Sequence, residues 1–296
     1  MENWKTKTFS IDHPAQHISS VWENIIRESV ELQSRHYIDL PYPKFSERFG
    51  GIRKGEVVVF GGRPSMGKTN VLIHLALHIS HANKTLFLSP DIHERALINR
   101  FISLQTNLPL SIINSGNPND VEMKKIMDAA THLAEKKILI NADYFHDPEK
   151  YLLFIENVVQ LEKLEVVIID NITSFGNRLK SHHHRHVSQL MRGLKKIARE
   201  YNIAILLSCS VSSLCEKKML HKRPELTHIS EQGEIKENAD KIIFIYRPMH
   251  YGMMYDSIGN SVEQLMEWII IKNKTGPVGT AKFQFDNTQL HLSELD

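Results

Sequence analysis

The sequence predicts an α/β fold in which a central, mostly parallel sheet is flanked by helices. Short apolar runs alternate with stretches of helical pattern along most of the chain. The apolar runs are continuous, which is typical of parallel strands that helices cover on both faces. A glycine-containing loop joins the first of these runs directly to a helical stretch. Together, these three observations indicate a layered α/β domain.

The predicted strands follow one another with helices in the intervals. The strands are EVVVF (56–60), TLFLS (85–89), KILI (137–140), EVVIID (165–170), AILLS (204–208), KIIFIY (241–246) and EWIIIK (267–272). The helices are expected at about 67–81, 93–106, 119–134, 147–162 and 185–201. Any one run would indicate only a buried segment, and it is the alternating order that predicts the fold class.

Residues 1–45 lie outside this alternation, so we expect an N-terminal arm before a domain over residues 46–296. A helix is predicted from an apolar face at helical spacing, formed by Ile18, Val21, Trp22, Ile25, Ile26 and Leu32. Ser20 and Glu23 fit a capping box, and the segment DLPYPKF separates this helix from the sheet. The pattern fits a helix folded onto its own domain and one packed on a neighbouring subunit equally well.

The composition is that of an ordinary globular protein, with 42% hydrophobic and 24% charged residues in 296. The net charge of +2 means that a nucleic-acid partner must be met by a local basic patch. Cys209 and Cys215 are the 2 cysteines, which suits a reducing compartment. The start MENWKTKTFS has no apolar signal core, and no apolar run approaches the ~18 residues of a membrane span. A cytoplasmic protein without membrane contact is expected.

The stretch GGRPSMGKT (61–69) carries the spacing Gly62-x-x-x-x-Gly67-Lys68-Thr69 of a Walker A phosphate loop, with a strand before it and a helix after it. In such a loop, main-chain N–H groups and the helix N-terminus bind phosphate oxygens, and the lysine reaches the β- and γ-phosphates. A nucleoside triphosphate site is therefore predicted. Its expected nucleotide-binding residues are Gly62, Arg63, Pro64, Ser65, Met66, Gly67, Lys68, Thr69 and Asn70.

A triphosphate site of this kind also needs oxygen ligands for Mg²⁺. EVVIID ends in Asp170 at the carboxyl end of a predicted strand, where open α/β sheets place their ligands. Asp170 therefore fits Walker B, and Thr69 can supply a hydroxyl. We expect Thr69 and Asp170 to hold the metal ion.

Several longer stretches, in order along the chain, resemble one family. They are GGIRKGEVVVFGGRPSMGKT, SPDIHERALINRFIS, VVIIDNI, LMRGLKKIAREYNIAILLS, KRPELTHISEQGEIKENADKIIFIYRP and IIIKNKTGPVGTAKFQF. Over about residues 38–290 the chain is similar to the RecA-like motor domain of the bacterial replicative DNA helicase DnaB. The resemblance implies a RecA-like P-loop NTPase. It places the helix near 17–35 where the family has a linker helix that docks on the adjacent subunit, and it finds no counterpart of the family's N-terminal, primase-contacting domain.

The resemblance also implies an assembly and an activity. It implies a homo-oligomeric ring, in this family of six subunits, with ATP and Mg²⁺ at the subunit interfaces and single-stranded DNA in the centre. ATP hydrolysis would drive translocation, in this family 5′ to 3′. The sequence gives no basis for naming a primase or a loader as a partner.

The residues expected to carry catalysis depart from the family at two positions. Asp91 stands where the family has a catalytic glutamate, so its carboxylate lies one methylene further back. A displacement near 1 Å can cost on the order of 10²-fold in rate. Lys272 and Lys274 stand where the family has a Lys-x-Arg pair that supplies an arginine finger in trans. Lysine keeps the charge but lacks the planar fork of arginine. Lys68, Asp91, Asp170, Lys272 and Lys274 are the expected catalytic residues.

Two further departures concern the coupling of nucleotide to DNA. Cys209 stands where the family has a glutamine that senses the γ-phosphate, and a thiol is only a weak hydrogen-bond former, so core packing is expected for it. Ser230 replaces an arginine of a DNA-contacting loop, in which Glu231 and Gly233 remain as candidate contacts.

Two basic stretches at the carboxyl ends of strands are expected to face DNA. NRLKSHHHRH (177–186) contains Arg178, Lys180 and Arg185, and EKKMLHKRPE (216–225) contains Lys217, Lys218, Lys222 and Arg223. Neither contains an aromatic residue, so contact with the phosphate backbone of single strands is predicted. Without the resemblance, a solvated charged loop would fit as well. The histidine run has no companion ligands for a metal.

Three functions remain open at this point. The first is an ATP-driven single-strand translocase or helicase. The second is a nucleotide- and DNA-binding DnaB-like protein with weakened or lost ATPase that acts as a scaffold, a loader-like factor or a regulator. The departures at Asp91, Lys274, Cys209 and Ser230 favour it. The third, a recombinase of the wider RecA class, fits the Gly-Pro-Val-Gly-Thr ending less well. The intact Walker A and B groups favour the first function.

Overall fold

A computed structural model describes residues 37–174, 183–218, 222–229, 232–286, 288 and 290–295. The predicted N-terminal helix, with its apolar face from Ile18 to Leu32, lies outside the described residues. Arg178, Lys180 and Glu231, expected to contact DNA, also lie outside them.

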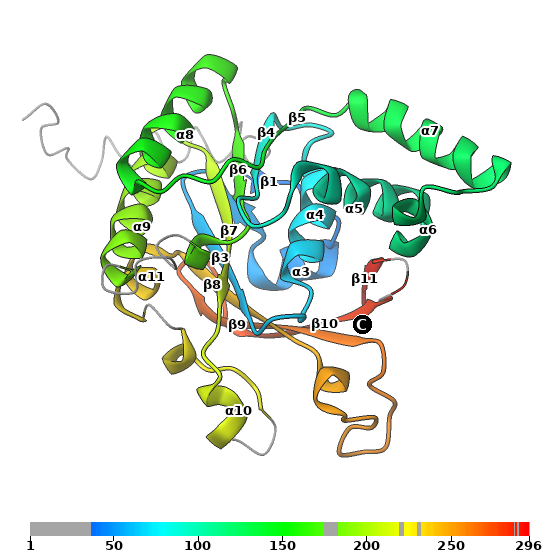
Figure 1. The fold of residues 1–296 in the computed structure, drawn as a ribbon. Coiled ribbons are helices and arrows are strands. Elements are labelled where there is room, and N and C mark those ends of the chain that lie inside the picture. The colour runs from blue at the N-terminus through cyan, green and yellow to red at the C-terminus, as the bar shows by residue number, and fades with distance from the viewer. Residues whose placement is uncertain are drawn as a thin grey trace, which may run out of the picture. The chain divides into compact units, whose positions relative to one another are not determined.

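The described residues form one large sheet with the strand order β11-β10-β9-β8-β3-β7-β6-β4-β5 (Figure 1). Its parallel part consists of β3 (Val57–Gly62), β4 (Thr85–Leu88), β5 (Ile138–Asn141), β6 (Val166–Ile169), β7 (Ala204–Ser210) and β8 (Lys241–Tyr246). The prediction of a central, mostly parallel sheet is confirmed. The order of the strands brings the ends of β3, β6 and β7 together.

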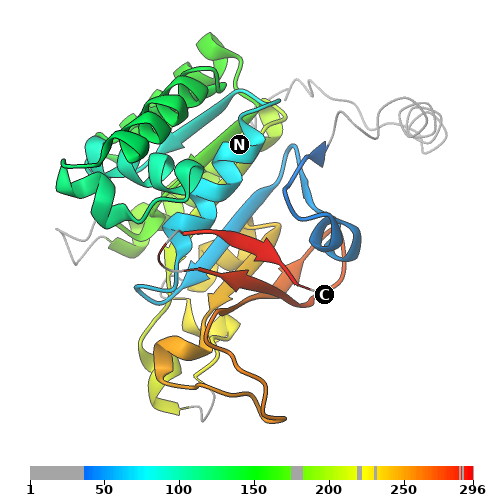
Figure 2. The same cartoon turned by 90° about the vertical axis from the view of Figure 1, so that its right-hand side faces the viewer.

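Antiparallel strands extend the sheet beyond β8. They are β9 (Leu265–Asn273), β10 (Gly279–Phe285) and β11 (Leu292–Glu294). A separate pair is formed by β1 (Tyr37–Ile38) and β2 (Ile52–Arg53). In Figure 2 the C-terminal strands lie beside α3 (Pro43–Phe49). Glu294 of β11 accepts hydrogen bonds from the main-chain N–H groups of Lys44, at 3.0 Å, and Phe45.

Helices cover both faces of the sheet, as predicted. The longer ones are α4 (Lys68–Ile79), α5 (Glu94–Thr106), α7 (Asp120–Ala134), α8 (Pro148–Glu162) and α9 (His183–Glu200), and the shorter ones are α6 (Leu110–Ser115), α10 (Leu214–Lys218) and α11 (Gln232–Asn238). Their starts follow local chemistry. Asn119 and Glu122 form a capping box at α7, and Asp147 caps α8 ahead of Pro148.

The core has two layers, one on each face of the sheet, and β3 contributes to both. Val58 and Phe60 pack in the layer that contains α4, whereas Val57 and Val59 pack in the layer that contains α8 and α9. Figure 1 shows α4 on one side of the sheet and α8 and α9 on the other. This is why the run EVVVF is apolar at every position after its first. Within the described residues, no helix is both long and apolar enough to cross a membrane.

The segment just before the sheet packs in the first of these layers. By its contacts, Ile38–Asp296 is one compact unit. Phe45 of α3 is buried, and its ring lies 5.3 Å from that of Trp268. The boundary expected between residues 45 and 46 thus falls inside α3. The assignment of the preceding residues to an arm stays a prediction.

Candidate functional site

The predicted phosphate loop lies between the end of β3 and the start of α4. Ser65 and Gly67 adopt left-handed conformations, with φ of 64° and 95°. A Cβ at Gly62 would lie 3.2 Å from the main-chain oxygen of Ile245 on β8, so glycine fits this close approach of two neighbouring strands. Gly67 is the N-cap of α4, and no side chain caps the helix. The first N–H groups of α4 are therefore not blocked by a side chain and can receive an anion.

Lys68 folds back over this loop. Its Nζ donates to the main-chain oxygens of Gly62, at 2.9 Å, and Arg63, at 3.1 Å. Burial lowers the pKa of Lys68, while the Asp170 carboxylate acts in the opposite direction. An ammonium has three N–H donors, so one remains for a phosphate oxygen beside the loop.

The other residues expected to bind nucleotide differ in how they can take part. Met66 is 1% exposed and packs in the core, so its side chain is not available to a nucleotide. The Arg63 side chain turns to Glu216 and Val211 rather than toward Lys68. Asn70 accepts a hydrogen bond from Arg100 of α5 at 3.4 Å. Pro64 and Ser65 are exposed.

Thr69 and Asp170 meet as predicted. The hydroxyl of Thr69 donates to Asp170 Oδ2 at 2.6 Å, and that of Ser208 donates to Oδ1 at 2.5 Å. Asp170 is 4% exposed. The hydroxyl and carboxylate oxygens fit the ligands that Mg²⁺ prefers, a small protein set completed by phosphate and water. In the described parts of the chain, no cluster of three or more His, Cys, Asp or Glu could hold a metal.

Sequence reasoning did not predict the role of Ser208, which neighbours Cys209 on β7. Strand residues alternate between faces, so Ser208 faces Asp170, while Cys209 is fully buried in the opposite core layer, as expected for that thiol. Just beyond the end of β6, Asn171 makes a second side-chain hydrogen bond to β7, donating to Ser210 Oγ at 3.2 Å. The ends of β6 and β7 are thus joined by side-chain hydrogen bonds.

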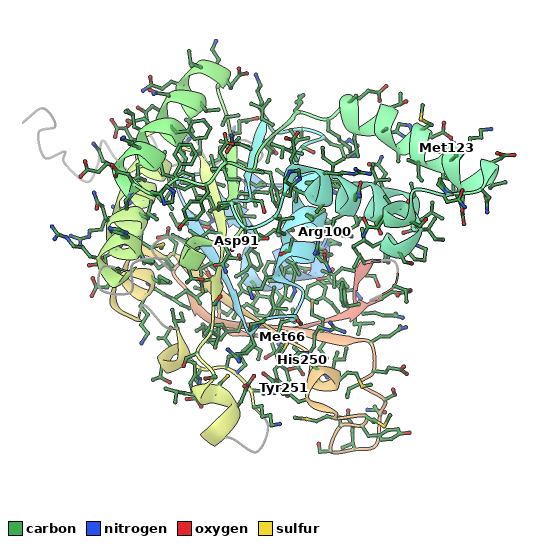
Figure 3. All side chains as sticks on the ribbon, in the orientation of Figure 1. Met66, Asp91, Arg100, Met123, His250 and Tyr251 are labelled. Carbon is green, nitrogen blue, oxygen red and sulfur yellow. The ribbon has the colours of Figure 1, made fainter. Side chains whose placement is uncertain are left out.

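Asp91 lies exposed in the turn between β4 and α5 (Figure 3). The strand order places β4 next to β6, with β6 and β7 between it and β3. The expected base and the expected magnesium ligand Asp170 therefore follow neighbouring parallel strands at the same edge of the sheet.

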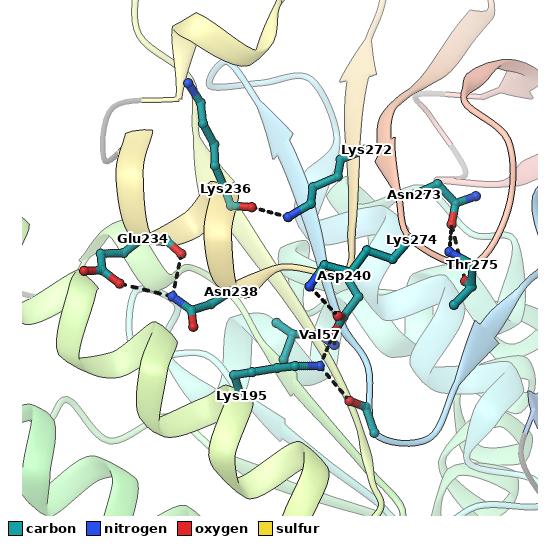
Figure 4. A network of polar contacts seen from close by, with 11 residues as sticks. Val57, Lys195, Glu234, Lys236, Asn238, Asp240, Lys272, Asn273, Lys274 and Thr275 are labelled. Carbon is teal, nitrogen blue, oxygen red and sulfur yellow. Dashed lines mark hydrogen bonds and ion pairs between the residues drawn. The ribbon is translucent and has the colours of Figure 1, made fainter. Parts of the chain in front are cut away.

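The two lysines expected to act in trans have partners in their own chain. Lys274 Nζ pairs with Asp240 Oδ1 at 3.1 Å, and Lys272 donates to the main-chain oxygen of Lys236 (Figure 4). Asp240 also accepts from Lys195 and from the N–H of Val57 at 2.8 Å. Burial raises the pKa of Asp240, but these hydrogen bonds outweigh it, so the pKa is lowered overall. The Lys274 side chain remains 43% exposed.

Two described cations of the second basic stretch lie over aromatic rings, a contact that the sequence did not predict. Lys222 Nζ lies 5.0 Å from the ring centroid of Tyr251, and the Arg223 guanidinium lies 5.5 Å from that of Tyr246. Arg223 also pairs with the nearly buried Glu267 at 2.7 Å. Tyr251 belongs to the short 3-10 helix η3 (Pro248–Tyr251) after β8. These rings come from a distant segment, so spacing within the loop could not reveal them.

The remaining candidate DNA contacts are placed only in part. Lys217 and Lys218 lie at the end of α10. Gly233 is in α11, with open space where a Cβ would be. Arg185 is exposed on α9. The histidine run 182–186 falls partly outside the described residues.

Comparisons with known proteins agree with this geometry. The family model for the DnaB-like helicase C-terminal domain matches residues 38–294. The chain is similar to a probable replicative DNA helicase of Trieres chinensis, with 29% identity over 80% of this chain and 52% of that one. It is also similar to the replicative DNA helicase DnaB of Helicobacter pylori, with 27% identity over 83% of this chain and 50% of that one. The chain thus spans about half the length of the curated relatives it matches.

Solved structures show the same fold. A solved structure of an ATPase domain superposes with a TM-score of 0.82 at 21% identity, covering 96% of this chain and 100% of that chain. A DnaB-like replicative helicase, described with its interactions with primase, has a TM-score of 0.81 at 21% identity and covers 97% of this chain and 69% of that chain. With a family model that matches most of its residues, the chain belongs to the DnaB-like helicase C-terminal domain family.

Proposed function

We propose that this chain is an ATP-hydrolysing motor that translocates along single-stranded DNA as a helicase of the DnaB type. The observation that carries the proposal is the Thr69–Asp170 hydrogen bond of 2.6 Å at the start of α4. It joins the two oxygen groups suited to Mg²⁺ beside a loop suited to phosphate. The names of the relatives, which are replicative DNA helicases, support a role in DNA replication. A cytoplasmic location stays a prediction.

Each residue of the site has a task in this proposal. The main-chain N–H groups of the loop and of α4 bind the phosphates, and Lys68 adds a positive charge. Thr69 and Asp170 hold Mg²⁺, which when bound neutralises charge on the triphosphate. Ser208 fixes the orientation of the Asp170 carboxylate. Asp91 orients the attacking water and accepts its proton.

The proposal includes a ring, hexameric in the family pattern, with ATP and Mg²⁺ where two subunits meet. Lys272 and Lys274 would then face the neighbouring subunit's triphosphate. Lys274 must exchange its partner Asp240 for a phosphate oxygen, and a lysine offers one point charge rather than a fork. We therefore expect slower turnover than an arginine would give at this position.

A second function has its own support. Lys274, the candidate finger, is paired with Asp240 of its own chain, and Arg223, a candidate DNA contact, is paired with Glu267. A DnaB-like protein that binds nucleotide and DNA but turns over little is consistent with both pairs. It would act as a scaffold, a loader-like factor or a regulator.

Steady-state ATPase measurements separate the two functions. The unaltered chain and Lys68→Ala are assayed with and without single-stranded DNA, and the mass in solution is recorded with nucleotide present. The motor proposal predicts turnover above Lys68→Ala, stimulation by DNA and an oligomer. Activity equal to that of Lys68→Ala in every condition would exclude the motor, and retained nucleotide affinity would then favour the second function.

A further inference from the structure

The phosphate loop is tied to α10 by a two-point ion pair between Arg63 and Glu216. Arg63 Nε donates to Glu216 Oε1 at 2.8 Å, and Nη2 donates to Oε2 at 3.3 Å. The third nitrogen, Nη1, donates to the main-chain oxygen of Val211 at 3.0 Å. The two side chains are 23% and 31% exposed, so water screens the pair only partly. A planar guanidinium held at three points fixes the direction as well as the distance of the contact.

Arg63 lies directly beside the group that would bind phosphate. Its main-chain oxygen accepts a hydrogen bond from Lys68 Nζ at 3.1 Å, while its side chain holds Glu216. The preceding Gly62 oxygen accepts from Lys68 Nζ at 2.9 Å and from the N–H of Val211 at 3.3 Å. Arg63 therefore links the Lys68 ammonium to α10, and a shift of either end must move Arg63.

Glu216, the first residue of the second basic stretch, also contacts Tyr251 through the oxygen Oε1 that accepts from Arg63 Nε. The hydroxyl of Tyr251, which is labelled in Figure 3, donates to Glu216 Oε1 at 3.4 Å. Lys222 Nζ lies over the same tyrosine ring. The hydrogen bond from Arg63 lowers the pKa of Glu216, whereas burial raises the pKa of Tyr251. At neutral pH the carboxylate is therefore charged and the phenol neutral, as this geometry requires. Glu216 belongs to α10, so DNA that displaced α10 or Tyr251 would displace Glu216 as well.

We propose that Glu216 is a positioning residue that connects a DNA site with the nucleotide site. Single-stranded DNA bound at α10 and Lys222 would act through Glu216 to change the positions of Arg63 and Lys68 at the phosphate loop. This inference rests on the proposed function, since it assumes that nucleotide and DNA bind at these two places. The Arg63–Glu216 pair would connect the nucleotide site with the DNA site without Cys209, whose thiol is buried in the core. Such coupling is reciprocal, because DNA must change nucleotide affinity by the same factor as nucleotide changes DNA affinity.

The test measures this linkage by binding. The affinity for a fluorescent non-hydrolysable ATP analogue with Mg²⁺ is determined with and without saturating oligothymidylate, at one salt concentration. For the unaltered chain we expect the two affinities to differ by a factor of about 5 or more. In Glu216→Gln the factor falls toward one, while DNA-free ATPase stays near that of the unaltered chain. Glu216→Asp, which keeps the charge, retains part of the linkage.

A control removes a more exposed ion pair that lies away from the loop. Glu162→Gln breaks the ion pair between Glu162 and Lys84, and it should leave the linkage intact. The Lys84 side chain is 40% exposed and that of Glu162 is 43% exposed. The proposal is overturned if Glu216→Gln keeps the full linkage, if the control loses it equally, or if the unaltered chain binds both ligands independently. Absent turnover in the unaltered chain would instead refute the motor function, and the binding factors would still decide the role of Glu216.

Discussion

Ser208 donates its hydroxyl proton to Asp170 at 2.5 Å, across the two strands that end beneath the phosphate loop. Asp170 therefore has one oxygen bonded to Ser208 and the other to Thr69. The carboxylate cannot rotate without breaking one of these bonds. A carboxylate fixed in this way needs no reorientation to bind the proposed Mg²⁺, which is how an outer partner strengthens a metal site.

The Ser208–Asp170 contact predicts an effect of Ser208→Ala on the requirement for magnesium. A hydrogen bond to a charged group is worth about 1.5–3 kcal/mol, so the concentration of Mg²⁺ for half-maximal ATPase should rise by about tenfold to a hundredfold. Magnesium titrations at saturating ATP check this. Ser80→Ala serves as control, because Ser80 is equally buried but lies at the far end of α4. An unchanged magnesium requirement in Ser208→Ala would show that Ser208 does not orient Asp170.

The proposed action of Lys274 in trans predicts that two inactive variants recover activity when mixed. Lys68→Ala lacks the loop lysine but keeps Lys274, whereas Lys274→Ala keeps the loop. A mixed ring contains interfaces with one intact copy of each, so the ATPase of the mixture should exceed the sum of its parts. Lys68→Ala mixed with Asp91→Ala is the control, since both residues belong to the same side of the interface. No recovery in the first mixture would argue that Lys274 acts only within its own chain.

The Lys274 position also predicts a gain of function. Lys274→Arg restores the planar fork, and arginine fingers contribute about 10³–10⁵ in rate elsewhere. For Lys274→Arg we expect part of this rate factor, as a rise in kcat with little change in the affinity for ATP. Single-turnover and steady-state rates measure it. If kcat falls or stays constant, the pairing of Lys274 with Asp240 is structural.

The buried His74 predicts a loss of stability at mildly acidic pH. Burial, with the nearby His291 and His78, lowers the pKa of His74 to about 4, against about 6.5 for a free histidine. The unfolded chain then binds a proton that the folded chain resists, so stability falls as the pH drops from about 6.5 to 4. His74→Gln should flatten this part of the curve by about 1–3 kcal/mol. Urea midpoints at several pH values, with the exposed His132→Gln as control, test the sign.

Most of the sheet could be predicted because its parallel strands are buried on both faces. β3 and β8 are buried at every position, which a continuous apolar run reveals. β10 was not predicted, because it contains no continuous apolar run like those of the predicted strands. Its exposed and buried residues alternate instead, as in an antiparallel strand with one covered face. The short helices α10 and α11 have too few turns for a helical period to be read from the sequence.

The site could be predicted where a motif fixes the spacing and not where contacts join distant segments. Gly62, Lys68 and Thr69 belong to one contiguous motif, and Asp170 follows an apolar strand, so the pattern places all four. Glu216 meets Arg63 across 153 residues, and Asp240 meets Lys274 only because β8 and β9 pair. Whether a charged side chain binds its own chain or a ligand depends on such distant partners.

Equilibrium binding of a fluorescent ATP analogue, with and without Mg²⁺, tests the nucleotide site most directly. We predict that Mg²⁺ strengthens binding to the unaltered chain, that Asp170→Asn loses this strengthening, and that Lys68→Ala weakens binding under both conditions. Binding that is equally strong in all three proteins, or no binding at millimolar concentrations of the analogue, would contradict the assignment of Lys68, Thr69 and Asp170 to a magnesium–triphosphate site.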